Sequence, residues 1–261
     1  MGKHGLVVRA LMAAALAVAG CAAFPAPTPI PTVVEAVVLD DSGSADTDRC
    51  AELGADLETA LARPDAGRLD LVVLALGDSR TGNEPVPLLQ RRFESGQVAF
   101  EQPGAEESAR RAWIEDAVST CDRSLAPSDR SPVLAAVVRA VETVRALCVE
   151  VERGGAVCTE RRLHIHSDFR DNVDPGVRAR LYPRRWSRAT SKATPPPIAR
   201  LDTGSIVVSA CGVSDTKTGP KEELVARGAV RDVWRQILGA DLEIAAGCPR
   251  VTRTRKPREG K

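Results

Sequence analysis

Short apolar runs alternate with amphipathic segments along most of the chain. The apolar runs have the length and β-branched character of strands buried on both faces. They cover residues 33–40, 69–76, 162–167, 205–211 and 242–246, and residues 97–101 suggest a further short strand at an edge. Apolar residues recur at helical spacing in four segments, residues 49–62, 106–119, 132–148 and 221–238. This alternation predicts an α/β fold, a doubly wound and mainly parallel sheet with helices on both faces.

Composition agrees with a single packed domain over residues 33–248. The chain of 261 residues is 43% hydrophobic, which excludes a disordered or collagen-like protein. Only 3% of the residues are aromatic, so the core must be built from aliphatic side chains. The formal net charge of +1 argues against a nucleic-acid-binding protein.

The first 20 residues have the features of an export signal. Lys3 and Arg9 precede a short Ala-rich apolar run, residues 10–19, which is too short to span a bilayer. The run ends in Val-Ala-Gly-Cys at residues 18–21, which resembles the lipobox of bacterial lipoproteins. The resemblance implies cleavage before Cys21, lipidation of Cys21 and anchoring to the bacterial cell envelope. Ala22 after the cysteine, in place of Asp, favours the outer membrane over the inner one. The alternative is an ordinary signal peptide that ends near a cysteine.

Both ends of the mature chain differ in composition from the domain. Residues 21–32 carry proline at every second position from Pro25 to Pro31. Such a segment favours polyproline II at about 3.1 Å per residue, a stiff tether of roughly 30 Å between membrane and domain. Residues 249–261 form a basic tail that is expected to be disordered.

The odd number of cysteines is explained if Cys21 carries the lipid. Six of the seven cysteines then remain, at positions 50, 121, 148, 158, 211 and 248. In an exported chain an even number suggests disulfides. The proposed topology brings Cys148 near Cys158, and Cys211 near Cys248, although some of the six could be buried free thiols. No CxxC pair is present, which argues against structural zinc.

Small polar residues follow several predicted strands, where ligands bind in α/β sheets. The first strand ends in Asp-Asp-Ser-Gly-Ser at residues 40–44, a D-x-S-x-S pattern. Ser131 stands before Pro132 as an expected N-cap of the next helix. Ser167 and Asp168 follow the strand that contains two histidines.

These three groups together resemble the metal-ion-dependent adhesion site of the von Willebrand factor A domain. The resemblance implies a Mg²⁺ site, with Mn²⁺ or Ca²⁺ as alternatives, because such hard cations prefer oxygen ligands. Ser42 and Ser44 would bind the metal directly, and Asp40 and Asp168 directly or through water. Ser131 would take the place of the family's Thr, a role for which Ser128 could compete. A carboxylate of a partner protein would complete the metal shell.

Besides Ser131 in place of Thr, the chain departs from the family pattern at two positions. Ala45 stands where the family often has Met, and Phe169 follows the Ser-Asp pair where the family often has Gly. The alternative to a metal site is a hydrogen-bonded turn before a helix, in a domain that keeps the fold as a metal-free envelope scaffold.

Two further motifs suggest enzymes but lack required partners. Gly77-Asp78-Ser79 resembles the GDS block of SGNH/GDSL-type serine esterases, yet no histidine follows His166 to act as the base. His164, His166 and Asp168 form an H-x-H-x-D pattern of metal hydrolases, but the one other histidine is His4 in the signal peptide. Both histidines are therefore expected to be packed, neutral and hydrogen-bonded.

A basic segment interrupts the predicted fold at about residues 175–200. Seven basic residues and no acidic one lie between Val177 and Arg200. The segment is expected to be a solvated surface insertion. An alternative is contact with anionic lipid head groups or acidic envelope polymers, with Trp186 and Tyr182 as anchors. Taken together, the sequence predicts a non-enzymatic, lipid-anchored adhesion module that binds a partner protein.

Overall fold

A six-stranded sheet forms the centre of the protein. The computed structural model describes residues 28–40, 49–61, 67–76, 85–94, 105–124, 130–183, 186–187, 194–212, 227–239 and 243–244. The strands are β1 (Pro31–Leu39), β2 (Arg68–Ala75), β3 (Val86–Glu94), β4 (Val157–His166), β5 (Val207–Cys211) and β6 (Glu243–Ile244), in the order β3-β2-β1-β4-β5-β6. All neighbouring pairs are parallel except β2 with β3. The predicted doubly wound, mainly parallel α/β fold is confirmed.

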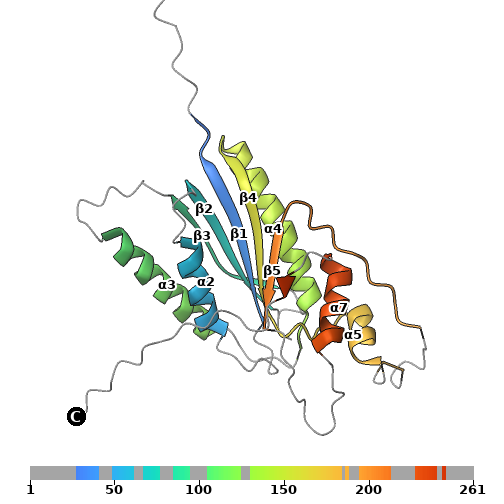
Figure 1. Cartoon of the computed structure of the whole chain (residues 1–261). Coiled ribbons are helices and arrows are strands. Elements are labelled where there is room, and N and C mark those ends of the chain that lie inside the picture. The colour runs from blue at the N-terminus through green and yellow to red at the C-terminus, as the bar shows by residue number, and fades with distance from the viewer. Residues whose placement is uncertain are drawn as a thin grey trace, which may run out of the picture.

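Helices cover both faces of this sheet (Figure 1). On one face lie α2 (Arg49–Leu61) and α3 (Ala105–Ser124). On the other lie α4 (Val133–Arg153), α5 (Pro175–Leu181) and α7 (Arg227–Leu238). None of the described helices is long and apolar enough to cross a bilayer.

The central strand β1 shows why helices must cover both faces of the sheet. Val34, Ala36 and Val38 are buried in the core that includes α4, whereas Val37 and Leu39 are buried in the core that includes α2. Because successive side chains of a strand point to opposite faces, a continuous apolar run requires a packed layer on each side. β1 begins at Pro31, two residues before the predicted start, and proline is tolerated at a strand's first position since no ladder donor is needed there.

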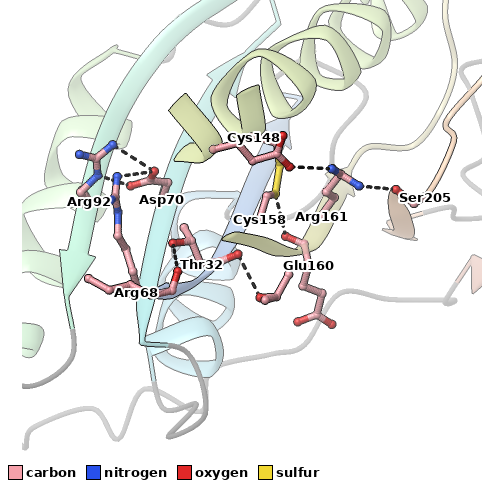
Figure 2. The surroundings of a disulfide bond; sticks show 12 residues. Thr32, Arg68, Asp70, Arg92, Cys148, Cys158, Glu160, Arg161 and Ser205 are labelled. Atoms are coloured by element: carbon pink, nitrogen blue, oxygen red, sulfur yellow. Dashed lines mark hydrogen bonds and ion pairs between the residues drawn. A yellow bond between two sulfur atoms is a disulfide. The ribbon is translucent and has the colours of Figure 1, made fainter. Parts of the chain in front are cut away.

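The antiparallel edge strand β3 was not expected from the sequence. Its residues alternate poorly and include Pro87 and several charges, which is typical of an edge strand. Arg92 Nε donates to Asp70 Oδ1 at 2.7 Å and ties β3 to β2 (Figure 2). The predicted strand at residues 97–101 lies outside the described residues.

The basic segment is not a solvated insertion from its start, so this expectation is corrected. Its first part forms α5, in which Gly176, Val177, Ala179 and Leu181 are buried. Asp174 caps α5 by accepting from the backbone of Gly176 and Val177 at 2.8 Å each. Apolar residues separate the arginines on this helix, and they pack against the core.

Two disulfides connect helices to their neighbours. Cys148 and Cys158 are bonded as predicted, joining α4 to β4 beside an exposed Arg161–Ser205 hydrogen bond (Figure 2). Cys50 and Cys121, which the sequence analysis left unassigned, join α2 to α3 with their Cα atoms 5.7 Å apart. Cys211 is also disulfide-bonded. Its predicted partner, Cys248, lies outside the described residues.

Candidate cation site

Asp40 lies at the carboxyl edge of the sheet, immediately after β1, and is fully buried. Its Oδ2 accepts hydrogen bonds from two hydroxyls, Ser131 Oγ at 3.1 Å and Ser167 Oγ at 2.5 Å. Its backbone N–H donates to the carbonyl of His166 at 2.9 Å, which extends the β1–β4 pairing by one residue. Residues from three distant parts of the sequence therefore meet at one carboxylate.

Ser131 does not cap α4, contrary to the sequence expectation. The helix begins at Val133, its N-cap position is Pro132, and no side chain of that position caps it. Instead, Asp171 Oδ2 accepts from the backbone N–H of Leu134 at 2.7 Å. Because a carboxylate from another segment caps the helix, the Ser131 hydroxyl is left to donate to Asp40. The backbone of Ser131 is held by Asn172, whose Oδ1 accepts from Ser131 N at 3.0 Å.

Asp168 forms a tight turn directly after β4. Its Oδ1 accepts from the backbone N–H of Arg170 at 3.0 Å. Its Oδ2 is buried and has no hydrogen-bond donor within the described part of the chain. Arg170 Nε, which carries positive charge, lies 3.8 Å from Asp168 Oδ2. A buried carboxylate oxygen without a donor is costly, and a cation would compensate for it.

Phe169 stands where the resembled pattern often has glycine, and its backbone adopts a conformation typical of glycine. Its φ is +62°, and no other non-glycine residue among those described has a positive φ. A side chain costs roughly 1–2 kcal/mol in this conformation, which glycine adopts freely. Phe169 is fully buried, its ring packs edge-to-face on Trp234 at 5.1 Å, and its carbonyl accepts from Trp234 Nε1 at 2.9 Å. These contacts offset the backbone strain.

The oxygen atoms at this edge are of the kind that hard divalent cations prefer. Asp40 and Asp168 carry carboxylates, and Ser131 and Ser167 carry hydroxyls whose O–H groups donate to Asp40. Arg170 lowers the net negative charge of the set. Of the predicted ligands, the structure brings Asp40 and Ser131 together and places Asp168 directly beside Ser167. Ser42 and Ser44 lie outside the described residues.

Ser167, Asp171 and Asn172 take part in this site although none of them is among the predicted ligands. Ser167 was visible as the first residue of the Ser-Asp pair, whereas no pattern indicated that Asp171 and Asn172 would hold the start of α4. Their partners lie about 40 positions earlier, at Ser131 and Leu134. Only the packing of the β4–α5 connection against α4 reveals these roles.

The two histidines of β4 point toward the face that carries α2. His166 is buried and hydrogen-bonds Asp56 Oδ2 at 2.5 Å and Glu52 Oε2 at 3.4 Å. Burial lowers the pKa of His166, but the hydrogen bonds to Asp56 and Glu52 outweigh burial, so the pKa is raised above 6.5. The expected packing and hydrogen bonding of His166 are confirmed, and the raised pKa favours the protonated form over the neutral imidazole that the sequence predicts. His164 Nδ1 hydrogen-bonds Ser209 Oγ at 2.6 Å, in line with the expectation of a hydrogen-bonded residue.

Of the two enzyme motifs, the structure describes the H-x-H-x-D pattern. No group of three or more His, Cys, Asp or Glu with metal-binding geometry occurs in the described ranges. Gly77, Asp78 and Ser79 lie outside these ranges.

No family model matches this sequence, and no curated protein sequence matches it. Among solved structures, the chain is similar to the manganese-loaded TRAP protein of Plasmodium vivax, with a TM-score of 0.41 and 12% identity over 84% of this chain and 70% of that chain. The pilus adhesin SpaC of Lactobacillus rhamnosus GG in its open conformation gives a TM-score of 0.45 and 10% identity over 85% of this chain and 28% of that chain.

Proximal thread matrix protein 1 of the mussel byssus gives a TM-score of 0.39 and 10% identity over 83% of this chain and 42% of that chain. The chain therefore spans less than half the length of the mussel and Lactobacillus chains. Similarity at this level concerns the arrangement of strands and helices alone.

Proposed function

We propose that this protein is a lipid-anchored binding module of the bacterial envelope that engages a partner protein through a divalent cation. The cation would be held by Asp40, Ser42, Ser44, Ser131 and Asp168. One observation carries this proposal: Asp40 and Ser131, 91 positions apart, share a hydrogen bond next to the Ser167–Asp168 turn at the carboxyl edge. The buried Asp168 Oδ2, which lacks a donor in the described part of the chain, supports it.

Each described residue has a distinct task in this proposal. Asp40 accepts hydrogen bonds from the Ser131 and Ser167 hydroxyls, so that their oxygen lone pairs face away from it. Asp168 presents one oxygen while the other is tied to the Arg170 backbone. A bound Mg²⁺, Mn²⁺ or Ca²⁺ would supply an open position for a carboxylate of the partner protein. The proposed role is binding and not catalysis.

A second candidate is a metal-free envelope scaffold of the same fold. Arg170 favours it, because a buried guanidinium 3.8 Å from Asp168 Oδ2 already provides positive charge there. The two candidates differ in one measurable property, the affinity for divalent cations.

The test is a titration of the purified mature protein with MgCl₂, MnCl₂ and CaCl₂, followed by calorimetry and thermal unfolding. Cation binding should raise the melting temperature, and stabilisation reaches about 2.7 kcal/mol at a hundredfold excess over Kd. Asp168→Asn should abolish this shift. Asp116→Asn, an exposed carboxylate on α3, should leave it unchanged. A wild-type protein without heat or melting shift would select the scaffold.

The anchor is tested separately in cells. Cys21→Ser should abolish incorporation of labelled palmitate and release the protein from the membrane fraction. Cys50→Ser serves as the control, because it removes a cysteine from a disulfide without touching the lipobox. Labelling that persists in Cys21→Ser would contradict the lipid anchor.

A further inference from the structure

We infer that Trp234 of α7 is a positioning residue for the cation site: through the carbonyl of Phe169, it holds Asp168 in the orientation that binds the cation. The inference rests on the proposed function above. It assigns a role to a side chain that lies on a helix and is not one of the expected ligands.

The first step concerns the turn that carries Asp168. Two short-range bonds shape it: the Phe169 N–H donates to Ser167 Oγ at 2.8 Å, and the Arg170 N–H donates to Asp168 Oδ1 at 3.0 Å. The second bond requires the backbone to reverse at Phe169, where φ is +62°, because the Arg170 N–H follows that rotation. If φ of Phe169 relaxed to a negative value, the Arg170 N–H would move away from Asp168, and the carboxylate would lose its fixed orientation.

The second step concerns what maintains that reversal. Glycine would adopt the positive φ without strain, but this chain has Phe. A phenylalanine in the left-handed region persists only where its surroundings hold it there. Trp234 provides two such contacts, an indole N–H hydrogen bond to the Phe169 carbonyl at 2.9 Å and an edge-to-face ring contact at 5.1 Å.

The third step concerns the rigidity of Trp234 itself. Its side chain is fully buried, and it belongs to the apolar stripe of α7 with Val230, Val233 and Ile237. The end of α7 is fixed by backbone bonds, since Leu201 N donates to the Ile237 carbonyl at 2.8 Å. The orientation of Asp168 is thereby linked to the position of α7 on the sheet.

A matched control for Trp234 lies on the opposite face of the sheet. Trp113 of α3 is 4% exposed and packs edge-to-face on Phe93 with ring centroids 4.4 Å apart. Trp113→Phe and Trp234→Phe therefore make the same change in two edge-to-face pairs whose tryptophan is buried. Only Trp234→Phe removes a donor to the turn that carries Asp168.

The experiment measures Mn²⁺ affinity of the mature protein by calorimetry, with wild type, Trp234→Phe and Trp113→Phe in parallel. Loss of one buried hydrogen bond predicts a fivefold to tenfold weaker affinity for Trp234→Phe. Trp113→Phe should stay within about twofold of wild type. In a Phe169→Gly background, Trp234→Phe should weaken affinity by less than about twofold, because glycine keeps the turn without help.

Amide hydrogen exchange in the metal-free protein provides a readout that does not depend on affinity. Exchange of the Arg170 N–H should accelerate in Trp234→Phe and not in Trp113→Phe, and this holds even if Phe169→Gly fails to fold. Equal Mn²⁺ affinity and equal Arg170 exchange in wild type and Trp234→Phe would overturn the inference alone. Absence of Mn²⁺ binding by the wild-type protein would overturn the proposed function and the inference with it.

Discussion

The Ser167 hydroxyl donates to Asp40 Oδ2 at 2.5 Å, although the two residues are 127 positions apart. The contact exists because β1 and β4 are adjacent and parallel, with Leu39 opposite His166. Residues that follow these two positions must therefore leave the sheet at the same edge. The same carboxylate oxygen also accepts a hydrogen bond from Ser131. The segments after β1, before α4 and after β4 are therefore hydrogen-bonded to one another through one buried carboxylate.

Removal of either hydroxyl should destabilise this edge. Ser167→Ala should lower the free energy of unfolding by about 1.5–3 kcal/mol, because it removes a hydrogen bond to a buried carboxylate. Ser131→Ala should cost less, since its bond to Asp40 is longer. Urea denaturation measures both effects, with Ser119→Ala on the exposed surface of α3 as the control. A Ser167→Ala protein as stable as wild type would contradict the proposed network.

The buried His166 should make stability depend on pH. Its pKa is raised above 6.5 because the bonds to Asp56 and Glu52 outweigh burial. A raised pKa in the folded state gives stabilisation that is fully present below the unfolded pKa and is lost as pH rises through the folded pKa. The free energy of unfolding should therefore fall from about pH 6.5 upward, with a limiting slope of about 1.4 kcal/mol per pH unit. His166→Gln should flatten this slope, and an unchanged slope would contradict the assignment.

Asp171 should be the most sensitive capping residue of α4. Its carboxylate accepts from the backbone of Leu134, Val173 and Asp174 at 2.7–2.8 Å, while burial raises its pKa above 3.8. Asp171→Ala leaves three backbone donors without this acceptor and should cost at least about 2 kcal/mol of unfolding free energy. Chemical denaturation is the measurement, with Asp116→Ala as the control. A cost below about 0.5 kcal/mol would show that water replaces the cap.

The two disulfides should differ in their contribution to stability. Cys50–Cys121 closes a sequence separation of 71 residues, and Cys148–Cys158 one of 10. Loop-closure entropy predicts about 4 kcal/mol for the longer loop and about 3 kcal/mol for the shorter one. Thermal unfolding should therefore show a larger drop in melting temperature for Cys50→Ala/Cys121→Ala than for Cys148→Ala/Cys158→Ala. The reverse order would indicate that packing around the bonds, and not loop length, determines their effect.

Local patterns in the sequence were sufficient for most strands of the sheet. The apolar runs that became β1, β2 and β5 were found close to their ends, because buried parallel strands leave an uninterrupted apolar signal. The carboxyl half of β4 was found in the same way, but the strand begins earlier than predicted, at Val157, because its first half is polar and partly exposed. β3 carries no such signal, since it has one neighbour and the exposed Arg91 and Arg92. α5 was missed because its buried residues are few and lie among arginines.

By itself, the sequence determined the α/β architecture and the strand ends where polar residues gather. Those features follow from short-range periodicity and from the rule that parallel strands share a carboxyl edge. The sequence also favoured Cys148–Cys158 among the possible pairings, because the two cysteines are close in the predicted topology. Only the tertiary structure decided how the polar residues are used. Ser131 donates to Asp40 because Asp171, from a different segment, caps α4 in its place. Phe169 tolerates a left-handed backbone because Trp234 packs on it from α7. Such roles depend on partners 37 to 91 residues away, and no local pattern encodes that distance.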